Sequence, residues 1–298
     1  MQNQVQNSGK SSTASKWLIG CGIGCGVVII ILILAGVGGY LFFKNIVRGF
    51  EETEAVMETL TEHFGKMSDF CPDPDGAIRA EQLEIFLAVR DSTAQAREKL
   101  ERAMSLLSDM SRRDQSEEEP SAPILTKIKT GIELVPLMAE FIKTRTQVLL
   151  DEGMGMGEYY YLYVILYYSW LEKSPADGPP FELMDEDDED AGLVWRGRRR
   201  ERLEERLDLT LRRLNRQILP MLHNQYAKLT EGGIPEAKKK WHDTLVTEIE
   251  AMESDSFRLP WQDGLPEVLE ASLEPYRMRL EESYSALVNP LEIIYRER

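Results

Sequence analysis

The chain has 298 residues, of which 43% are hydrophobic, and it carries a formal net charge of −16. This hydrophobic content is enough to build a core and excludes a wholly disordered chain. The charge is unevenly distributed, because residues 1–48 contain four basic residues and no acidic residue, which leaves −20 for residues 49–298. A domain this acidic repels nucleic acid, so we expect no nucleic-acid partner.

The first predicted element is a single membrane-spanning helix over residues 17–43, preceded by a polar N-terminal tail over residues 1–16. No charged residue interrupts these 27 residues, and an apolar helix of about 20 residues is enough to cross the hydrocarbon core. Aromatic and basic residues mark the two interfaces, with Trp17 at one end and Tyr40 and Lys44 at the other. We expect an uncleaved signal anchor. A cleaved signal peptide fits less well, because its apolar region would be shorter and Gly36 and Gly38 offer only a poor cleavage site. A lipoprotein box ending at Cys21 also fits less well, because such a box follows an apolar region and here the apolar region comes after it.

Four glycines give the predicted span two overlapping pairs at GxxxG spacing: Gly20, Gly22, Gly24 and Gly26. Such spacing lets two helix backbones approach closely in lipid. We therefore expect transmembrane self-association, with a homodimer formed through this helix. The alternative is that glycine is simply common in membrane helices.

The orientation in the membrane is predicted from signals that are weaker than the apolar span itself. Basic residues flank both ends of the span, and an N-terminal anchor that is not cleaved most often exports the domain that follows it. We expect a bacterial inner or plasma membrane protein with a single span and a periplasmic soluble domain.

The rest of the chain predicts an all-α fold. Apolar residues recur every three or four positions, which is typical of amphipathic helices, and no stretch alternates as a strand does. The expected fold is the N-terminal transmembrane helix followed by a bundle of about six to seven helices. Their predicted ranges are 50–70, 79–111, 123–151, 158–173, 197–229, 235–252 and 266–288.

We divide this part of the chain into two helical subdomains at an acidic, proline-rich segment. Residues 44–173 form the first subdomain, a stalk and helices with a linker at 112–122, and residues 196–298 form the second. The segment between them, 174–195, contains six consecutive acidic residues at 185–190 and predicts a flexible loop.

The predicted helix at 158–173 is rich in tyrosine and apolar on nearly every side. A helix of this kind is usually the buried centre of a domain. A pocket beside it for a small apolar or aromatic ligand is the alternative interpretation.

Three further patterns are best explained structurally. The segment around Asp73, Asp75 and Gly76 resembles the middle of an EF-hand calcium loop, but cysteine and glutamine occupy the two end positions where acidic ligands are needed, so we expect a turn. Nine arginines between residues 196 and 216 alternate with acidic residues, which is typical of a solvated face. Residues 260–292 are dense in prolines and aromatics, and we expect a C-terminal helix fixed at both ends; a partner-binding surface is the alternative.

No motif predicts catalysis, and we assign no catalytic, cofactor-binding or metal-binding residue and no cofactor. The three histidines occur in no E-x-x-H or H-E-x-x-H pattern, and no nucleophile elbow or phosphate-binding loop is present. The favoured function is a non-catalytic interaction or scaffold module of the cell envelope with an unknown protein partner. The alternatives are the apolar ligand-binding protein and, more remotely, an enzyme without a recognisable motif.

Overall fold

The structure is a computed structural model that describes residues 53–114, 124–179 and 199–293. The segment 17–43 with its four glycines and the acidic run at 185–190 lie outside these residues, so the predictions made for them stay predictions. Among the described helices, none is both long enough and apolar enough to cross a membrane.

The described residues form helices joined by turns and loops, with no strand among them, which confirms the all-α prediction. They belong to the second of two units, Gly49–Arg298. In the second unit, a helix over residues 53–64 comes first. The long helices that follow are α2 (Ala80–Ser92), α3 (Ala94–Asp114), α4 (Ile124–Glu152), α6 (Arg199–Thr230) and α7 (Lys239–Ser254). The shorter ones are η1 (Met67–Asp69), α5 (Met156–Tyr163), the π-helix η2 (Val164–Trp170), η3 (Glu236–Lys238), α8 (Glu267–Leu273), η4 (Glu274–Tyr276), α9 (Arg277–Ser283) and α10 (Asn289–Ile293).

Three helices predicted as continuous are broken. The expected helix at 50–70 ends at residue 64, and η1 follows after Gly65, whose φ is 82°. The expected helix at 79–111 is α2 and α3, separated at Thr93, whose hydroxyl donates to the carbonyl of Val89 at 2.8 Å. A side chain that bonds to its own backbone turn competes with regular helix propagation. The expected helix at 266–288 is α8, η4 and α9, and Pro275 in η4 lacks the N–H that an α-helical bond at this point requires.

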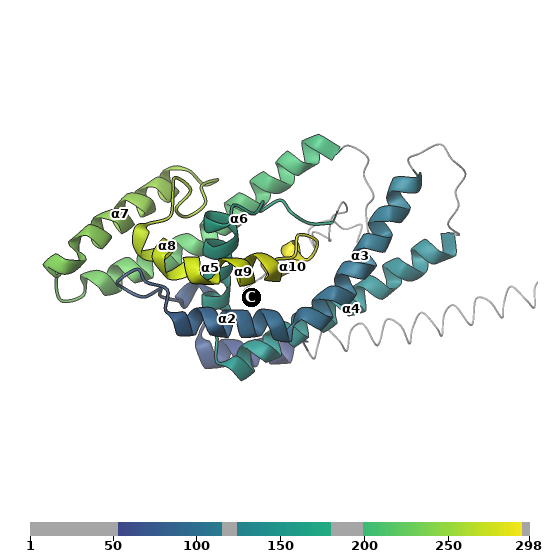
Figure 1. The fold of residues 1–298 in the computed structure, drawn as a ribbon, viewed down its shortest axis with the longest axis horizontal. Coiled ribbons are helices and arrows are strands. Elements are labelled where there is room, and N and C mark those ends of the chain that lie inside the picture. The colour runs from purple at the N-terminus through teal and green to yellow at the C-terminus, as the bar shows by residue number, and fades with distance from the viewer. Residues whose placement is uncertain (1–52, 115–123, 180–198, 294–298) are drawn as a thin grey trace, which may run out of the picture. The chain divides into compact units, whose positions relative to one another are not determined.

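The tyrosine-rich segment is the centre of the main core, as expected from its composition. α5 and the π-helix η2 are almost wholly buried and pack against side chains of α2, α6, α7, α8 and α9. Figure 1 shows α5 between α2 and α9. In η2, the N–H of Leu171 bonds to the carbonyl of Leu166, five residues back, at 3.0 Å. The wider π-turn is rare and often marks a functional position.

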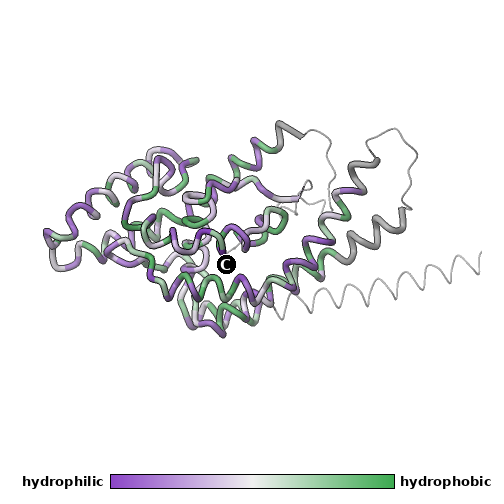
Figure 2. Tube along the Cα trace, viewed as in Figure 1, coloured by the Kyte–Doolittle hydropathy of each residue, from purple (hydrophilic) through white to green (hydrophobic). Residues whose placement is uncertain are grey.

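A second apolar cluster joins α3 and α4 to the C-terminal segment. It contains Leu100 and Leu107 of α3, Phe141 of α4, and Val288 and Leu291 near α10. In Figure 2, apolar (green) and polar (purple) positions alternate along the coloured parts of α3 and α4. The last described residues therefore contact the core built from residues near the start of the unit, and contacts cross the predicted division at 174–195.

Candidate functional site

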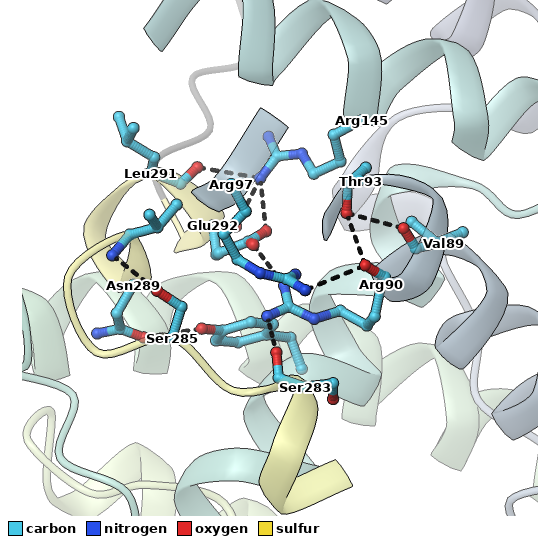
Figure 3. Close-up of polar contacts among 12 residues, drawn as sticks. Val89, Arg90, Thr93, Arg97, Arg145, Ser283, Ser285, Asn289, Leu291 and Glu292 are labelled. Atoms are coloured by element: carbon cyan, nitrogen blue, oxygen red, sulfur yellow. Dashed lines mark hydrogen bonds and ion pairs between the residues drawn. The ribbon is translucent and has the colours of Figure 1, made fainter. Parts of the chain in front are cut away.

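A buried ion cluster lies where α10 meets α2 and α4. The carboxylate of Glu292 pairs with Arg90 of α2 on one side and with Nη1 of Arg145 of α4, at 3.2 Å, on the other. The side chains of Arg90 and Glu292 are 0% exposed, and that of Arg145 is 1% exposed. Figure 3 shows the three side chains converging from separate helices. Charges this deeply buried are tolerated only when they are paired and hydrogen-bonded.

Tyr159 of α5 contacts the cluster from a fourth helix. Its hydroxyl accepts from Nη1 of Arg90 at 3.1 Å and donates to Oε2 of Glu292 at 2.8 Å. Arg90 also donates to the backbone carbonyl of Ser283, at the end of α9. Arg145 donates to the carbonyls of Leu291 and Glu292 at 3.0 and 3.2 Å. A cation at these last carbonyls of α10 satisfies groups that the short helix leaves unpaired.

Further tyrosine hydroxyls from α5 and η2 bond to the same C-terminal segment. Tyr163 and Tyr168 both donate to Oδ1 of Asn289, at 3.0 and 2.6 Å, and Tyr167 shares a 2.7 Å hydrogen bond with the Ser283 hydroxyl. The tyrosines therefore serve as buried polar partners of the chain end. This use favours core packing over an aromatic ligand pocket.

The aromatic rings also stabilise the buried cations. The guanidinium carbon of Arg90 lies 5.6 Å from the ring centres of Tyr163 and Tyr167, and that of Arg145 lies 5.8 Å from those of Phe141 and Tyr159. At these distances the negative face of each ring attracts a cation.

The electrostatics of the cluster keep Glu292 ionised. Burial raises the pKa of this carboxyl, but the positive charges of Arg90 and Arg145 outweigh burial and leave the pKa below its usual value. The pKa of Arg90 is raised well above its usual value, because the attraction of Glu292 overcomes the effect of burial.

A third arginine, Arg97 of α3, points into the same cluster. It is 8% exposed, and its Nη2 donates to the carbonyl of Arg90 at 3.1 Å. Its Nη1 is buried and has no hydrogen-bond partner among the described residues. Burial first, and the charge of Arg90 second, lower the pKa of Arg97. Figure 3 shows the guanidinium of Arg97 beside Arg90 and Glu292.

The segment that resembles a calcium loop is a turn held by an arginine. Arg79 pairs with Asp73 at 3.2 Å and with Asp75 at 2.8 Å, and Gly76 adopts a φ of 77°. Gln82 accepts from the N–H of Arg79 at 2.8 Å and so caps the start of α2. In the described part of the chain, no group of three or more potential metal ligands gathers anywhere.

The dense pattern at 260–292 is fixed at both ends, as its composition led us to expect. At one end Glu248 accepts from the N–H of Trp261 at 2.9 Å and pairs with Arg258 at 3.0 Å. Trp261 has a φ of 58°, a left-handed conformation that is unusual for a bulky residue and requires such support. At the other end Glu292 pairs with Arg90.

The sequence analysis missed the ion cluster, although the sequence held a signal for it. Arg90 follows the apolar run Ile85–Val89, and Glu292 stands between Leu291 and Ile293. A single charge inside an apolar stretch indicates a buried, paired charge. The identity of each partner could not follow, because pairing across 202 positions depends on the tertiary fold.

In comparisons with protein-family models, with curated proteins and with solved structures, nothing matches this chain. The fold and the site define an all-α protein whose C-terminal segment is bound to its core by a buried cluster of arginines, tyrosines and one glutamate.

Proposed function

We propose that this chain is a membrane-anchored, non-catalytic interaction or scaffold module of the cell envelope. The apolar segment 17–43 supports the anchor. The observation that carries the non-catalytic part is the protonation state of the buried ionisable groups.

A general acid or base works best when its pKa lies near the working pH. Several buried groups have pKa values that are shifted further from neutrality than usual. The pKa of Glu292 is lowered, because the charges of Arg90 and Arg145 outweigh the effect of burial, and the carboxylate therefore stays ionised. Burial raises the pKa values of Tyr159 and Tyr163, so these hydroxyls stay neutral. Burial also raises the pKa of the Cys71 thiol, which reduces the thiolate needed for nucleophilic attack. These groups suit a stable fold better than proton transfer.

The first half of α6 supports a role in interaction. Its described side chains from residue 203 to residue 209 are all exposed or half-buried, and the first buried one is Thr210. Leu203 and Leu209 are 54% and 55% exposed. The two side chains are six positions apart, about 120° around the helix axis, so they offer a partner two separate apolar contacts. We take a second copy of this chain as the partner, because GxxxG pairing in the membrane would raise the local concentration of identical α6 helices.

Disulfide crosslinking in native membranes tests this function. In a chain with its three natural cysteines changed to serine, Leu203→Cys and Leu209→Cys should each give a covalent dimer upon mild oxidation. The control is Met278→Cys, because Met278 is 73% exposed and belongs to α9 rather than to α6. Adding Gly22→Ile should reduce the dimer. Equal dimer at all three positions, or none at Leu203 and Leu209, would contradict the proposal.

A further inference from the structure

The buried cluster contains more positive than negative charge. Three arginines, Arg90, Arg97 and Arg145, enter it, whereas Glu292 is the one carboxylate that the hydrogen bonds and ion pairs of the described residues bring to it. The surrounding tyrosines are neutral, since burial raises their pKa values. The cluster therefore carries a formal excess of two positive charges.

Arg97 carries one of these two charges without any carboxylate partner, and the other remains on the pair of arginines that share Glu292. Arg90 and Arg145 both bond to Glu292, while Arg97 bonds to a backbone carbonyl alone, and its Nη1 lies buried without a partner in the described part of the chain. The Nε atoms of Arg90 and Arg145 are likewise buried and without such a partner. An unpaired buried charge costs several kcal/mol, and a water molecule can satisfy an N–H but cannot neutralise the charge.

We infer that this cluster is an anion-binding site, in which Arg97 holds a phosphate or carboxylate group through its Nη1. A guanidinium presents its N–H groups in a planar fork that matches the oxygens of such groups better than it matches a spherical ion. The residual exposure of 8% places Arg97 nearer to solvent than Arg90, which is fully buried. A phosphate dianion at Arg97 would balance both charges that Glu292 leaves uncompensated, and a carboxylate would balance one of them. This site is distinct from the interaction face on α6 and does not depend on it.

Inorganic phosphate is the first probe, with the full chain in nanodiscs of neutral phosphatidylcholine. At a phosphate concentration about 100-fold above the dissociation constant, the unfolding temperature should rise by several degrees relative to chloride at equal ionic strength. Titration calorimetry with phosphate should give a saturable heat. Arg97→Met should remove both effects.

Arg102→Met is the matched control, because Arg102 lies on the same helix and its side chain is 71% exposed. It should leave the response to phosphate unchanged. Arg97→Lys keeps the charge but loses the fork, so it should fold and bind phosphate about tenfold or more weakly. If circular dichroism shows that Arg97→Met does not fold, the phosphate affinity of Arg97→Lys is the measurement that tests the inference.

A second arm distinguishes a soluble anion from a lipid headgroup. Nanodiscs that contain phosphatidylglycerol, without added phosphate, should raise the unfolding temperature in an Arg97-dependent way if the group comes from lipid, and should have no such effect if it comes from solution. The inference is overturned if neither phosphate nor phosphatidylglycerol stabilises the chain relative to its control. It is also overturned if Arg102→Met abolishes the response as fully as Arg97→Met, or if Arg97→Lys binds phosphate as tightly as the natural chain.

Discussion

Glu292 and Arg90 are 202 residues apart in the chain, yet their side chains pair directly in the core with no exposure to solvent. The pair joins α10, near the last described residue, to α2, near the first. Tyr159 contacts both partners and Arg145 contacts Glu292 from the opposite side. The C-terminal segment is thus part of the core.

Glu292→Gln should strongly destabilise the protein. It leaves Arg90 and Arg145 buried without a countercharge, and breaking one partner of a buried ion pair costs about 3–5 kcal/mol. The measurement is the free energy of unfolding in urea. Glu282→Gln on the exposed face of the same region is the control and should change it by less than about 0.5 kcal/mol. Similar free energies of unfolding for the two variants would show that the pairing of Glu292 with Arg90 does not hold the C-terminal segment on the core.

Gly76→Ala should destabilise the protein much more than Gly153→Ala. Both glycines have a φ of 77°, so the backbone strain of a non-glycine residue is common to the two variants. A Cβ at Gly76 would lie 2.4 Å from the ring of Trp241, whereas at Gly153 it would meet nothing within 4 Å. Overpacking of this kind adds about 1–3 kcal/mol. Equal unfolding free energies would mean that the Trp241 ring can move aside.

The protein should unfold cooperatively in alkali. Burial raises the pKa values of the tyrosines of α5 and η2: Tyr159, Tyr160, Tyr161, Tyr163, Tyr167 and Tyr168. Because their folded pKa values lie above an unfolded value of about 10, their stabilisation is complete below pH 10 and falls as the pH rises, by about 1.4 kcal/mol per pH unit for each tyrosine. Tyrosinate absorbance from these residues should therefore appear together with the loss of helical circular dichroism. A gradual rise in absorbance while the helix content stays constant would contradict this.

Cys71 should label slowly in the native protein. The residue is half-buried, and burial raises the pKa of its thiol, so little thiolate is present at neutral pH. With Cys21 and Cys25 changed to serine, maleimide should react several-fold faster in urea than in buffer. Ser105→Cys, at an exposed position of α3, should react quickly in both urea and buffer when Cys71 is also changed to serine.

The Ser105→Cys variant is also the better reporter of membrane orientation. Labelling by an impermeant maleimide in intact spheroplasts would support a periplasmic domain, and labelling only after lysis would contradict it.

The helices were predictable because each buries an apolar stripe whose period the sequence displays. The burial of the tyrosine-rich segment followed from the same reasoning, since a helix without a polar face has no side to turn to water. The breaks were less predictable. Thr93 interrupts a pattern that continues on both sides, because its hydroxyl bond to Val89 is a local competition that periodicity does not record.

The candidate site was predictable only in part. The apolar neighbours of Arg90 and Glu292 indicate burial, but Arg97 and Arg145 are ordinary residues for amphipathic helices, and either could have faced solvent. Their convergence depends on how α2, α3, α4 and α10 pack, which one sequence does not specify.

The pairing of Glu292 with Arg90 can form only late in synthesis, because Glu292 follows Arg90 by 202 residues. Chains are made from the N-terminus, and domains tend to fold as they emerge. Here the arginines are made long before the carboxylate that compensates them, so the core around α5 lacks a countercharge until residue 292 has been added. A product truncated before that residue would retain every long helix and still expose uncompensated charge and apolar surface. A chain that stops before residue 292 therefore differs from the complete cluster in charge and in exposed apolar surface, and these are features that proteases and chaperones recognise.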